Sequence, residues 1–298
     1  MSLQKRRNRI TLNRLIEALL RLPSVIPPQV LTKLSNLPGL RKVYYVFLRR
    51  FTSETMVEVQ GNKLYLIPSA SGVELSLFLY RQHEKAKTRQ FNQLIKKGMT
   101  VLDLGAHIGY YTLLAAKLVG PEGKVFAFEA APENFYFLKR NVELNQYHNI
   151  NLIQKAVSDK TGEATFYLDS ESWGHSLAPL VKSKKSITVS TISLDDFLQD
   201  DIVVDFVKIN IEGAEGRAIN GMNRLLRKGN TKYIMVDFHL NELETQGSSF
   251  KGTWDDLTTL GFLFYDMRGN KTRLVSFEEA VYLAGKREGG IHLLGLRN

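Results

Sequence analysis

The 298-residue sequence contains no cysteine. This absence excludes disulfide bonds, thiolate metal sites and cysteine nucleophiles. The sequence also lacks a run of 18 apolar residues, so we expect no segment that crosses a bilayer. Arg14, Glu17 and Arg21 interrupt the apolar part of the N-terminal stretch, which therefore lacks the apolar core of a secretion signal. We expect a cytoplasmic protein that is free or peripheral to a membrane.

Acidic residues are almost absent from residues 1–50. This segment has eleven Lys and Arg side chains against Glu17 alone, and the rest of the chain is balanced, so the segment carries the whole net charge of +10. Residues 9–22 also place apolar side chains at helical spacing opposite basic ones. Such a helix suits an anionic membrane surface or a partner, and packing against the rest of the chain is equally compatible. Nucleic acid is disfavoured because aromatic and basic residues are not interleaved.

Helix-like and strand-like segments alternate through most of residues 56–298, which we assign to one domain after a basic amphipathic N-terminal extension at 1–55. The alternation predicts an α/β fold with a mostly parallel sheet and helices on both faces. Two closing strands with little helix between them predict an antiparallel edge. The expected strands cover 56–67 (a hairpin), 100–104, 124–128, 150–157, 164–168, 187–191, 206–211, 233–238, 262–266 and 291–296. The expected helices cover 72–81, 84–96, 110–118, 132–145, 194–198, 214–226 and 254–260.

Two fingerprints of phosphate-binding loops are absent or incomplete. No Gly-Lys-Ser/Thr ending occurs, which disfavours nucleoside triphosphate hydrolysis. The stretch VLDLGAHIGYYT at 101–112 has the first glycine of a dinucleotide fingerprint, but His107 and Tyr110 replace the other two, which disfavours NAD. An Asp103 carboxylate would repel a pyrophosphate and suits an ammonium group. The loop therefore favours a ligand with an amino group and no phosphate, bound by Asp103, Gly105, Ala106, His107 and Gly109; a local capping role for His107 is an equal alternative.

Acidic residues also follow the next two strands. Glu129 ends the second strand of the alternating region, 26 residues after Asp103. Its carboxylate can accept hydrogen bonds from both hydroxyls of a ribose; a solvated strand-end acid is the alternative, which becomes less favoured beside the Asp103 loop. Ser158 and Asp159 end the third strand and are assigned to the adenine amino group, although an Asp that only forms a turn is about as compatible.

Four segments together resemble one family of enzymes. They are VLDLGAHIGYYT at 101–112, FAFEAAPEN at 126–134, KAVSD at 155–159 and VDFVKINIEGAE at 204–215. In order and spacing they resemble the FkbM family of S-adenosylmethionine-dependent methyltransferases over about residues 84–240. The resemblance implies a Rossmann-like class I methyltransferase domain with a seven-stranded sheet, and S-adenosylmethionine as its cofactor. It also implies O-methylation of a hydroxyl on a glycan, a glycolipid or a small metabolite.

The chain departs from the family pattern at two positions. His107 stands where the family usually has Asn, and both side chains can form hydrogen bonds. Asn210 replaces the Asp of the family's Lys-Ile-Asp-x-Glu-Gly segment, in which Lys208 is interpreted as structural. Asparagine cannot act as a general base, although its oxygen can be a weak ligand for a divalent metal. We assign no metal site, and a cofactor-binding protein with little or no turnover is the alternative function.

Methyl transfer to a hydroxyl requires a group that removes the hydroxyl proton. We expect this group beyond the fourth or fifth strand, where the catalytic candidates are Asn210, Glu212, Glu215 and His239. Histidine ordinarily titrates near neutral pH, but a strand-end surface residue is the favoured alternative for His239. Acids that stabilise a helix N-terminus are an equal alternative for the two glutamates. The balanced charge outside residues 1–50 disfavours an rRNA or tRNA methyltransferase, because phosphate contacts need basic side chains.

Overall fold

The computed structural model describes residues 54–68, 71–169, 174–178, 185–267, 273–286 and 290–297. The predicted helix at 9–22 lies outside the described residues. The described chain forms two compact units, the first from residues of 54–61 and 66–83 and the second from 62–65 and 84 onward. The main part of the second unit begins at residue 84, where the family resemblance also begins, and the predicted boundary after residue 55 stays a prediction. No helix in these ranges is long and apolar enough to cross a membrane.

The predicted hairpin and the helix after it are both present. β1 (Thr55–Val59) and β2 (Asn62–Leu66) form a two-stranded sheet. Gln60 and Gly61 connect them with φ angles of 54° and 75°, the left-handed backbone that suits a two-residue hairpin turn. α4 (Gly72–Tyr80) then covers the segment predicted as helical.

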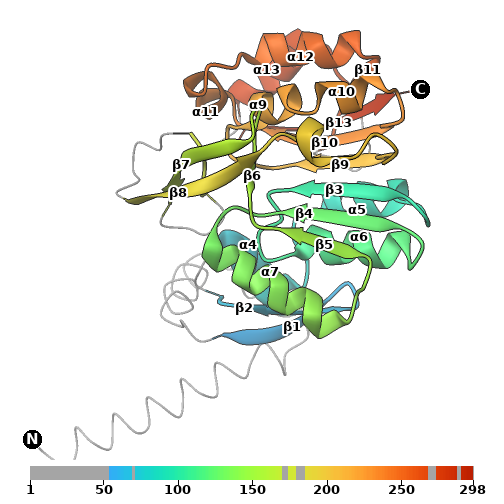
Figure 1. Cartoon of the computed structure of the whole chain (residues 1–298), viewed down its shortest axis with the longest axis vertical. Helices are drawn as coiled ribbons and strands as arrows, with labels where there is room; N and C mark the ends of the chain where they lie inside the picture. Colours follow the sequence, from blue (N-terminus) through green and yellow to red (C-terminus); the bar gives the residue numbers. More distant parts are fainter. Residues whose placement is uncertain are drawn as a thin grey trace, which may run out of the picture. The chain divides into compact units, whose positions relative to one another are not determined.

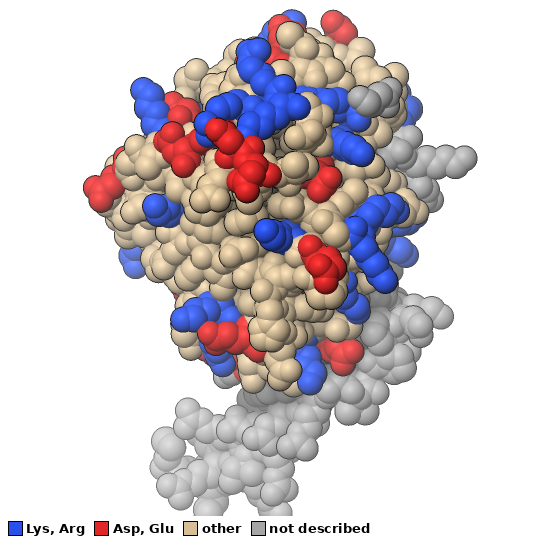
Figure 2. Space-filling model, turned by 45° about the vertical axis from the view of Figure 1, so that its right-hand side comes forward, with Lys and Arg blue, Asp and Glu red and all other residues tan. Residues whose placement is uncertain are grey.

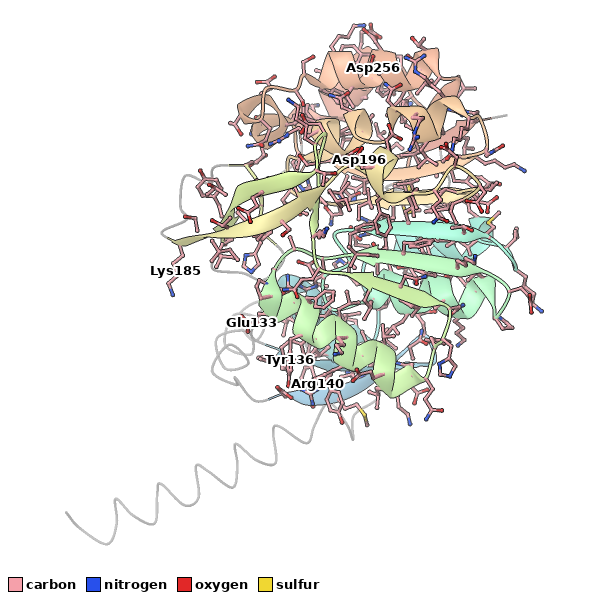
Figure 3. All side chains as sticks on the ribbon, viewed as in Figure 1. Glu133, Tyr136, Arg140, Lys185, Asp196 and Asp256 are labelled. Atoms are coloured by element: carbon pink, nitrogen blue, oxygen red, sulfur yellow. The ribbon has the colours of Figure 1, made fainter. Side chains whose placement is uncertain are left out.

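Residues 62–65 belong to the second unit because side chains of α7 (Pro132–Asn145) hold them. The backbone N–H of Tyr65 donates to Asn141 Oδ1 at 2.6 Å, and the Asn141 amide donates back to the Tyr65 carbonyl at 3.1 Å. The Arg140 guanidinium lies 4.5 Å from the centre of the Tyr65 ring and 5.4 Å from that of Tyr136. Figure 3 shows Tyr136 and Arg140 on one side of this helix. The same helix therefore covers the main sheet and fixes β2.

The main sheet of the second unit has the order β12-β11-β13-β10-β9-β3-β4-β5 (Figure 1). The five strands from β10 to β5 are parallel, whereas β13 is antiparallel to both β10 and β11, and β12 to β11. The mostly parallel sheet with an antiparallel end is thus confirmed, with β12, of two residues, as an eighth strand. Its strands are β3 (Thr100–Leu104), β4 (Lys124–Phe128), β5 (Ile150–Ile153), β9 (Phe206–Ile209), β10 (Tyr233–Phe238), β11 (Phe262–Asp266), β12 (Arg273–Leu274) and β13 (Ile291–Arg297).

Helices cover both faces of this sheet, as predicted. On β9, Val207 belongs to a core that also contains side chains of the helices between β9 and β11. The ring of Phe206, on the other side of the strand, packs edge-on against Phe91 of the helix before β3, at 5.3 Å between ring centres. The alternating side chains of one strand thus serve two layers. The helices are α5 (Lys85–Leu94), α6 (Tyr110–Val119), α7, α8 (Leu194–Phe197), α9 (Glu215–Asn220), α10 (Asn223–Arg227), α11 (Leu240–Thr245), α12 (Phe250–Thr259) and α13 (Phe277–Gly285).

The strand predicted at 150–157 is in fact two strands in different sheets. β5 ends at Ile153, and β6 (Ala156–Val157) pairs with β8 (Lys185–Ile192), which also pairs with β7 (Gly162–Leu168). Val157 can then pack in the core beside Ile192. A continuous apolar run does not reveal such a change of partner, because each residue keeps an extended backbone.

One helical prediction needs correction, and two helices were not predicted. The helix predicted at 214–226 is divided into α9 and α10 at Gly221, where a Cβ would lie 2.0 Å from the Ser158 carbonyl oxygen. α11 was not predicted. Nor was α13, which lies between the two closing strands where little helix was expected. Its start carries a readable signal, because the Ser276 hydroxyl accepts a hydrogen bond from the N–H of Glu279 in a Ser-x-x-Glu pattern.

Candidate functional site

The glycine loop lies at the point where the strand order of the sheet reverses, between β3 and β9. Ligands of open α/β sheets bind at such a point, beyond the carboxyl ends of the strands. Gly105 has a φ of 78°, and a Cβ there would lie 2.0 Å from the carbonyl oxygen of Asn210, which follows β9. The N–H groups of Gly105 and Ala106 both donate to the Phe128 carbonyl, at 3.0 and 2.9 Å. The loop is therefore tied to both neighbouring strands, and only glycine fits its first turn.

His107 stands at a position that requires left-handed backbone. Its φ is 53°, and that of Gly109 is 98°. Asn and His are among the few residues other than glycine that adopt this conformation with any frequency. The exchange of the family's Asn for His107 therefore keeps the shape of the loop. The N–H of His107 donates to Glu129 Oε2 at 2.8 Å, which joins the loop to the end of β4.

Asp103 is buried beneath the loop, and each of its carboxylate oxygens has a partner within the protein. Lys208 Nζ lies 2.8 Å from Asp103 Oδ1, and Thr112 Oγ1 donates to Asp103 Oδ2 at 2.6 Å. The same ammonium donates to the Gly105 carbonyl at 3.1 Å. These contacts support the structural interpretation of Lys208. Contact between Asp103 and a ligand ammonium stays a prediction, and in this arrangement the ligand would share the carboxylate with Lys208.

Glu129 is also buried, at the tip of β4. Its oxygens accept the N–H groups of His107 and Ala131, each at 2.8 Å. Burial raises the pKa of Glu129 above its usual value, against the opposing effect of these two N–H groups and of the Asn134 side chain. A carboxylate offers about four acceptor positions, so three donors leave about one for a ligand. The ribose assignment stays a prediction, and the geometry favours one hydroxyl over two.

Ser158 and Asp159 do not end the third strand of the main sheet, which was the basis for assigning them to adenine. They follow β6 in the three-stranded sheet. Ser158 is fully buried and its hydroxyl donates to Asp159 Oδ1 at 2.9 Å, while Arg217 Nε lies 2.8 Å from the same oxygen. This contact with Arg217 lowers the pKa of Asp159, although burial opposes it. The placement explains a structural role, and it gives adenine contact no support.

Three of the four catalytic candidates meet in one buried group, the acid–base cluster of Glu212, Glu215 and His239. His239 Nε2 lies 3.1 Å from Glu212 Oε2, and His239 Nδ1 lies 3.0 Å from Glu215 Oε1. The N–H of Gly213 donates to that Glu215 oxygen at 2.9 Å. Glu212 and Gly213 form a turn with φ angles of 51° and 100°. A non-glycine residue held in this conformation is a common feature of functional sites.

His239 and Glu212 differ in the pH at which they change charge. Burial opposes a charge on His239, but Glu212 and Glu215 outweigh it and raise the pKa of His239 to about 10. Burial is also the main effect that raises the pKa of Glu212 to about 7; Glu215 adds to it and His239 opposes it. His239 is therefore a cation at neutral pH and not a free base. Glu212 is the member that changes charge near neutral pH, as a general base should.

Asn210, the fourth candidate, follows β9 between the loop and the acid–base cluster. Its N–H donates to the Leu104 carbonyl at 3.1 Å. Its side-chain Oδ1 is buried, with no hydrogen-bond partner among the described residues. A buried polar atom of this kind usually has a partner in the complete system. Asn210 can therefore accept a hydrogen bond from a bound ligand or a water molecule.

Sequence reasoning missed a second group, the ion-pair cluster of buried Lys87 and Asp237 with half-buried Glu84 and His292. Lys87 Nζ pairs with Asp237 Oδ2 and lies 2.7 Å from Glu84 Oε2. His292 Nδ1 lies 2.8 Å from Asp237 Oδ1. Burial opposes the charge of Lys87, but Asp237 and Glu84 outweigh it and raise the pKa of Lys87. Glu84 and Lys87 form an i,i+3 pair, but no local pattern brings this pair together with Asp237 and His292, which are far away in the sequence.

The ion-pair cluster contains the donor types of a metal site. Ligand atoms of Glu84, Asp237 and His292 lie within 4.8 Å of one another. Both carboxylates, however, already pair with the Lys87 ammonium. Burial raises the pKa of Asp237, but Lys87 and His292 outweigh it and lower that pKa well below its usual range. In this arrangement the cation between the carboxylates is Lys87.

The sequence model of one family, described as Methyltransferase FkbM domain, matches residues 103–277, which is more than half of the chain. The chain belongs to this FkbM methyltransferase family. Membership confirms the resemblance found in the sequence, the Rossmann-like methyltransferase domain and S-adenosylmethionine as the expected cofactor.

Individual relatives match only parts of the FkbM chain. A protein-L-isoaspartate O-methyltransferase of Methanothrix thermoacetophila is 39% identical over 59 residues, or 20% of this chain and 28% of the relative. Methyltransferase 1 of Beauveria bassiana is 27% identical over 145 residues, or 41% of this chain and 58% of the relative. The matches thus span less than two thirds of either relative. A solved FkbM methyltransferase of Methylobacillus flagellatus covers 86% of this chain and 59% of its own, with 11% identity and a TM-score of 0.42, on which we base no inference.

Proposed function

We propose that this FkbM protein transfers the methyl group of S-adenosylmethionine to a hydroxyl oxygen, with Glu212 as the base. The observation that supports the proposal most is the acid–base cluster, in which Glu212 has a pKa raised to about 7. It follows β9, at the edge of the sheet where the Gly105 loop follows β3. Methyl transfer to a hydroxyl needs a bound methyl donor and a base that removes the hydroxyl proton, and the Gly105 loop and Glu212 would supply these two functions at the same edge of the sheet.

The loop fits the cofactor in shape and chemistry. Gly105, Ala106, His107 and Gly109 would lie along the cofactor, and Glu129 would meet a ribose hydroxyl. The absence of a side chain at Gly105 lets the loop pack directly against the backbone of Asn210, beside the end of β9. When bound, S-adenosylmethionine supplies a methyl group on a positively charged sulfur.

The acid–base cluster can take up the proton that the hydroxyl loses. Glu212 accepts this proton and becomes neutral. His239 keeps its charge and remains paired with Glu215, which holds the imidazole ring through Nδ1. Asn210 is not needed as a base. Its Oδ1 has no hydrogen-bond partner among the described residues, so it can accept a hydrogen bond from the molecule that is methylated. The family's Asp is thus replaced without loss of a proton acceptor.

The acceptor is expected to be a glycan, a glycolipid or a small hydroxylated molecule. Figure 2 shows acidic and basic side chains interspersed on the visible face of the described chain.

Contact of residues 1–50 with an anionic membrane surface is also part of the proposal, and it depends on the sequence of these residues alone.

The test combines cofactor binding with methyl transfer. Isothermal titration should show binding of S-adenosylmethionine, and labelled methyl groups should appear on hydroxyl acceptors in preference to amines and carboxylates. Glu212→Gln should lower kcat by about 100-fold or more, as loss of a general base does. Glu244→Gln, on the exposed side of α11, is the matched control and should be fully active. Transfer mainly to carboxylates or amines would refute hydroxyl methylation, and full activity of Glu212→Gln would refute the base. Binding without transfer would favour the alternative of a cofactor-binding protein.

A further inference from the structure

A cavity of about 320 Å³ lies beside the ion-pair cluster in the second unit. It is lined by Glu84, Lys85, Ala86, Lys87, Met267 and His292. These residues come from the start of α5, the end of β11 and the start of β13. Pockets for small ligands begin at about this volume and combine apolar walls with a few polar groups. Here Ala86 and Met267 are the apolar part, and Glu84 and His292 are the polar part.

The cavity lies at the same edge of the sheet as the cofactor loop. β10 and β11 end there, and β13 begins there, with Asp237 opposite His292 in the strand register. Neighbouring strands are about 4.8 Å apart, so β13 is separated from β3 by roughly 15 Å across β10 and β9. The acid–base cluster follows β9 and β10, between β13 and β3, so the acceptor needs to span only part of this distance.

Asp237 connects the cavity to the acid–base cluster. Its carboxylate contacts Lys87 and His292, which line the cavity. It is also two residues before His239, which directly follows the last residue of β10, and its charge contributes to the raised pKa of both His239 and Glu212. A molecule in the cavity would therefore lie near the acid–base cluster. The proposed reaction does not use Glu84 or His292, although both belong to the ion-pair cluster and line the cavity.

The charges around the cavity balance. Glu84 and Asp237 are matched by Lys87 and Lys85, and His292 adds a ring nitrogen that can donate or accept. A phosphate or carboxylate would approach the Glu84 carboxylate, and an ammonium would approach Lys87. A hydroxyl can both donate to a carboxylate and accept from an ammonium or a ring N–H. The wall therefore suits neutral hydroxyl groups better than either charge.

We propose that this cavity is a binding subsite for the acceptor, and that it takes an uncharged, hydroxyl-bearing ring next to the hydroxyl that is methylated. Glu84 and His292 form hydrogen bonds to that ring, and Ala86 packs against its carbon face. The subsite rests on the proposed function, because it supplies the second part of the methyl acceptor.

Ala86→Leu tests the subsite by filling the cavity without changing its charge. Gln93→Leu is the matched control, because it adds the same side chain at an exposed position of the same helix. The probe is methyl α-D-glucopyranoside, titrated by saturation-transfer NMR into the full chain with S-adenosylhomocysteine present. Glucosamine and glucose 6-phosphate are its charged counterparts.

We expect the neutral glycoside to bind the original chain and Gln93→Leu equally, and Ala86→Leu at least tenfold more weakly at an unchanged melting temperature. The two charged sugars should bind more weakly than the neutral one. Absence of glycoside binding, equal binding by Ala86→Leu, or tighter binding of a charged sugar would each overturn the subsite. Titration of the same proteins with S-adenosylmethionine separates this result from the proposed function, since loss of cofactor binding would refute the function alone.

Discussion

Replacement of Gly105 by alanine should damage both stability and cofactor binding. Two costs combine in Gly105→Ala. The φ of 78° costs a residue with a Cβ about 1–2 kcal/mol. The new Cβ would also lie 2.0 Å from the Asn210 oxygen, whereas carbon–oxygen contacts are normally about 3.3 Å or longer. The loop or the end of β9 must therefore move by about 1 Å, and overpacking of this kind costs about 1–3 kcal/mol.

The total for Gly105→Ala is thus about 2–5 kcal/mol, or a fall of about 4–20 °C in melting temperature at about 2–4 °C per kcal/mol. Gly98→Ala separates the two costs, because Gly98 has a φ of 81° and nothing within 4 Å of a Cβ. It should lose only about 1–2 kcal/mol and keep its affinity for S-adenosylmethionine. Scanning calorimetry and isothermal titration measure both effects. Equal losses in the two variants would show that close contact at Gly105 does not shape the loop.

Four further predictions concern the cofactor, the base, its neighbour and the N-terminal segment. Glu129→Ala should weaken S-adenosylmethionine binding by about 1–3 kcal/mol, and unchanged affinity in isothermal titration would remove the ribose assignment. Because Glu212 must be deprotonated and its pKa is raised to about 7, kcat/KM should rise about tenfold per pH unit below that value and level off above it; a rate that falls over this range contradicts the base. His239→Gln removes the cation that lowers the pKa of Glu212, so the pKa of Glu212 and the midpoint of the pH profile should both move to higher pH. An unmoved midpoint would show that His239 is not charged. Deletion of residues 1–50 should leave cofactor affinity unchanged and reduce binding to vesicles containing phosphatidylserine; vesicle binding equal to that of the full chain would exclude the membrane role.

Much of the sheet was predictable because its strands are local patterns. The bounds predicted for β3, β4 and β11 agree with the structure. Each is a short, mostly apolar run next to a glycine or a charged residue, and such runs form strands whatever their partners are. The run at 150–157 failed because its division depends on β8, a partner more than 25 residues away. Pairing of that kind has no trace in the local sequence.

The functional site was predictable to the extent that it depends on position within the sheet. Parallel strands end at one edge, so residues after β3, β4, β9 and β10 had to meet there. Glu212, Glu215 and His239 do meet. Their roles could not be predicted, because the pKa of His239 depends on the two carboxylates that flank it and on burial. The ion-pair cluster was missed because it too depends on the folded structure, in which Lys87 and Asp237 meet although they are 150 positions apart in the sequence.

Asn210 does not by itself favour a protein without turnover. An Asp at this position, two residues before Glu212, would add another buried carboxylate after β9, and a like charge nearby raises the pKa of its neighbours. Glu212 already has a pKa of about 7. A further negative charge would hold more of it in the protonated form, which cannot accept a proton from a hydroxyl. Asparagine keeps a hydrogen-bond acceptor at the site and leaves Glu212 able to change charge near neutral pH. The exchange is therefore compatible with the proposed base in the acid–base cluster.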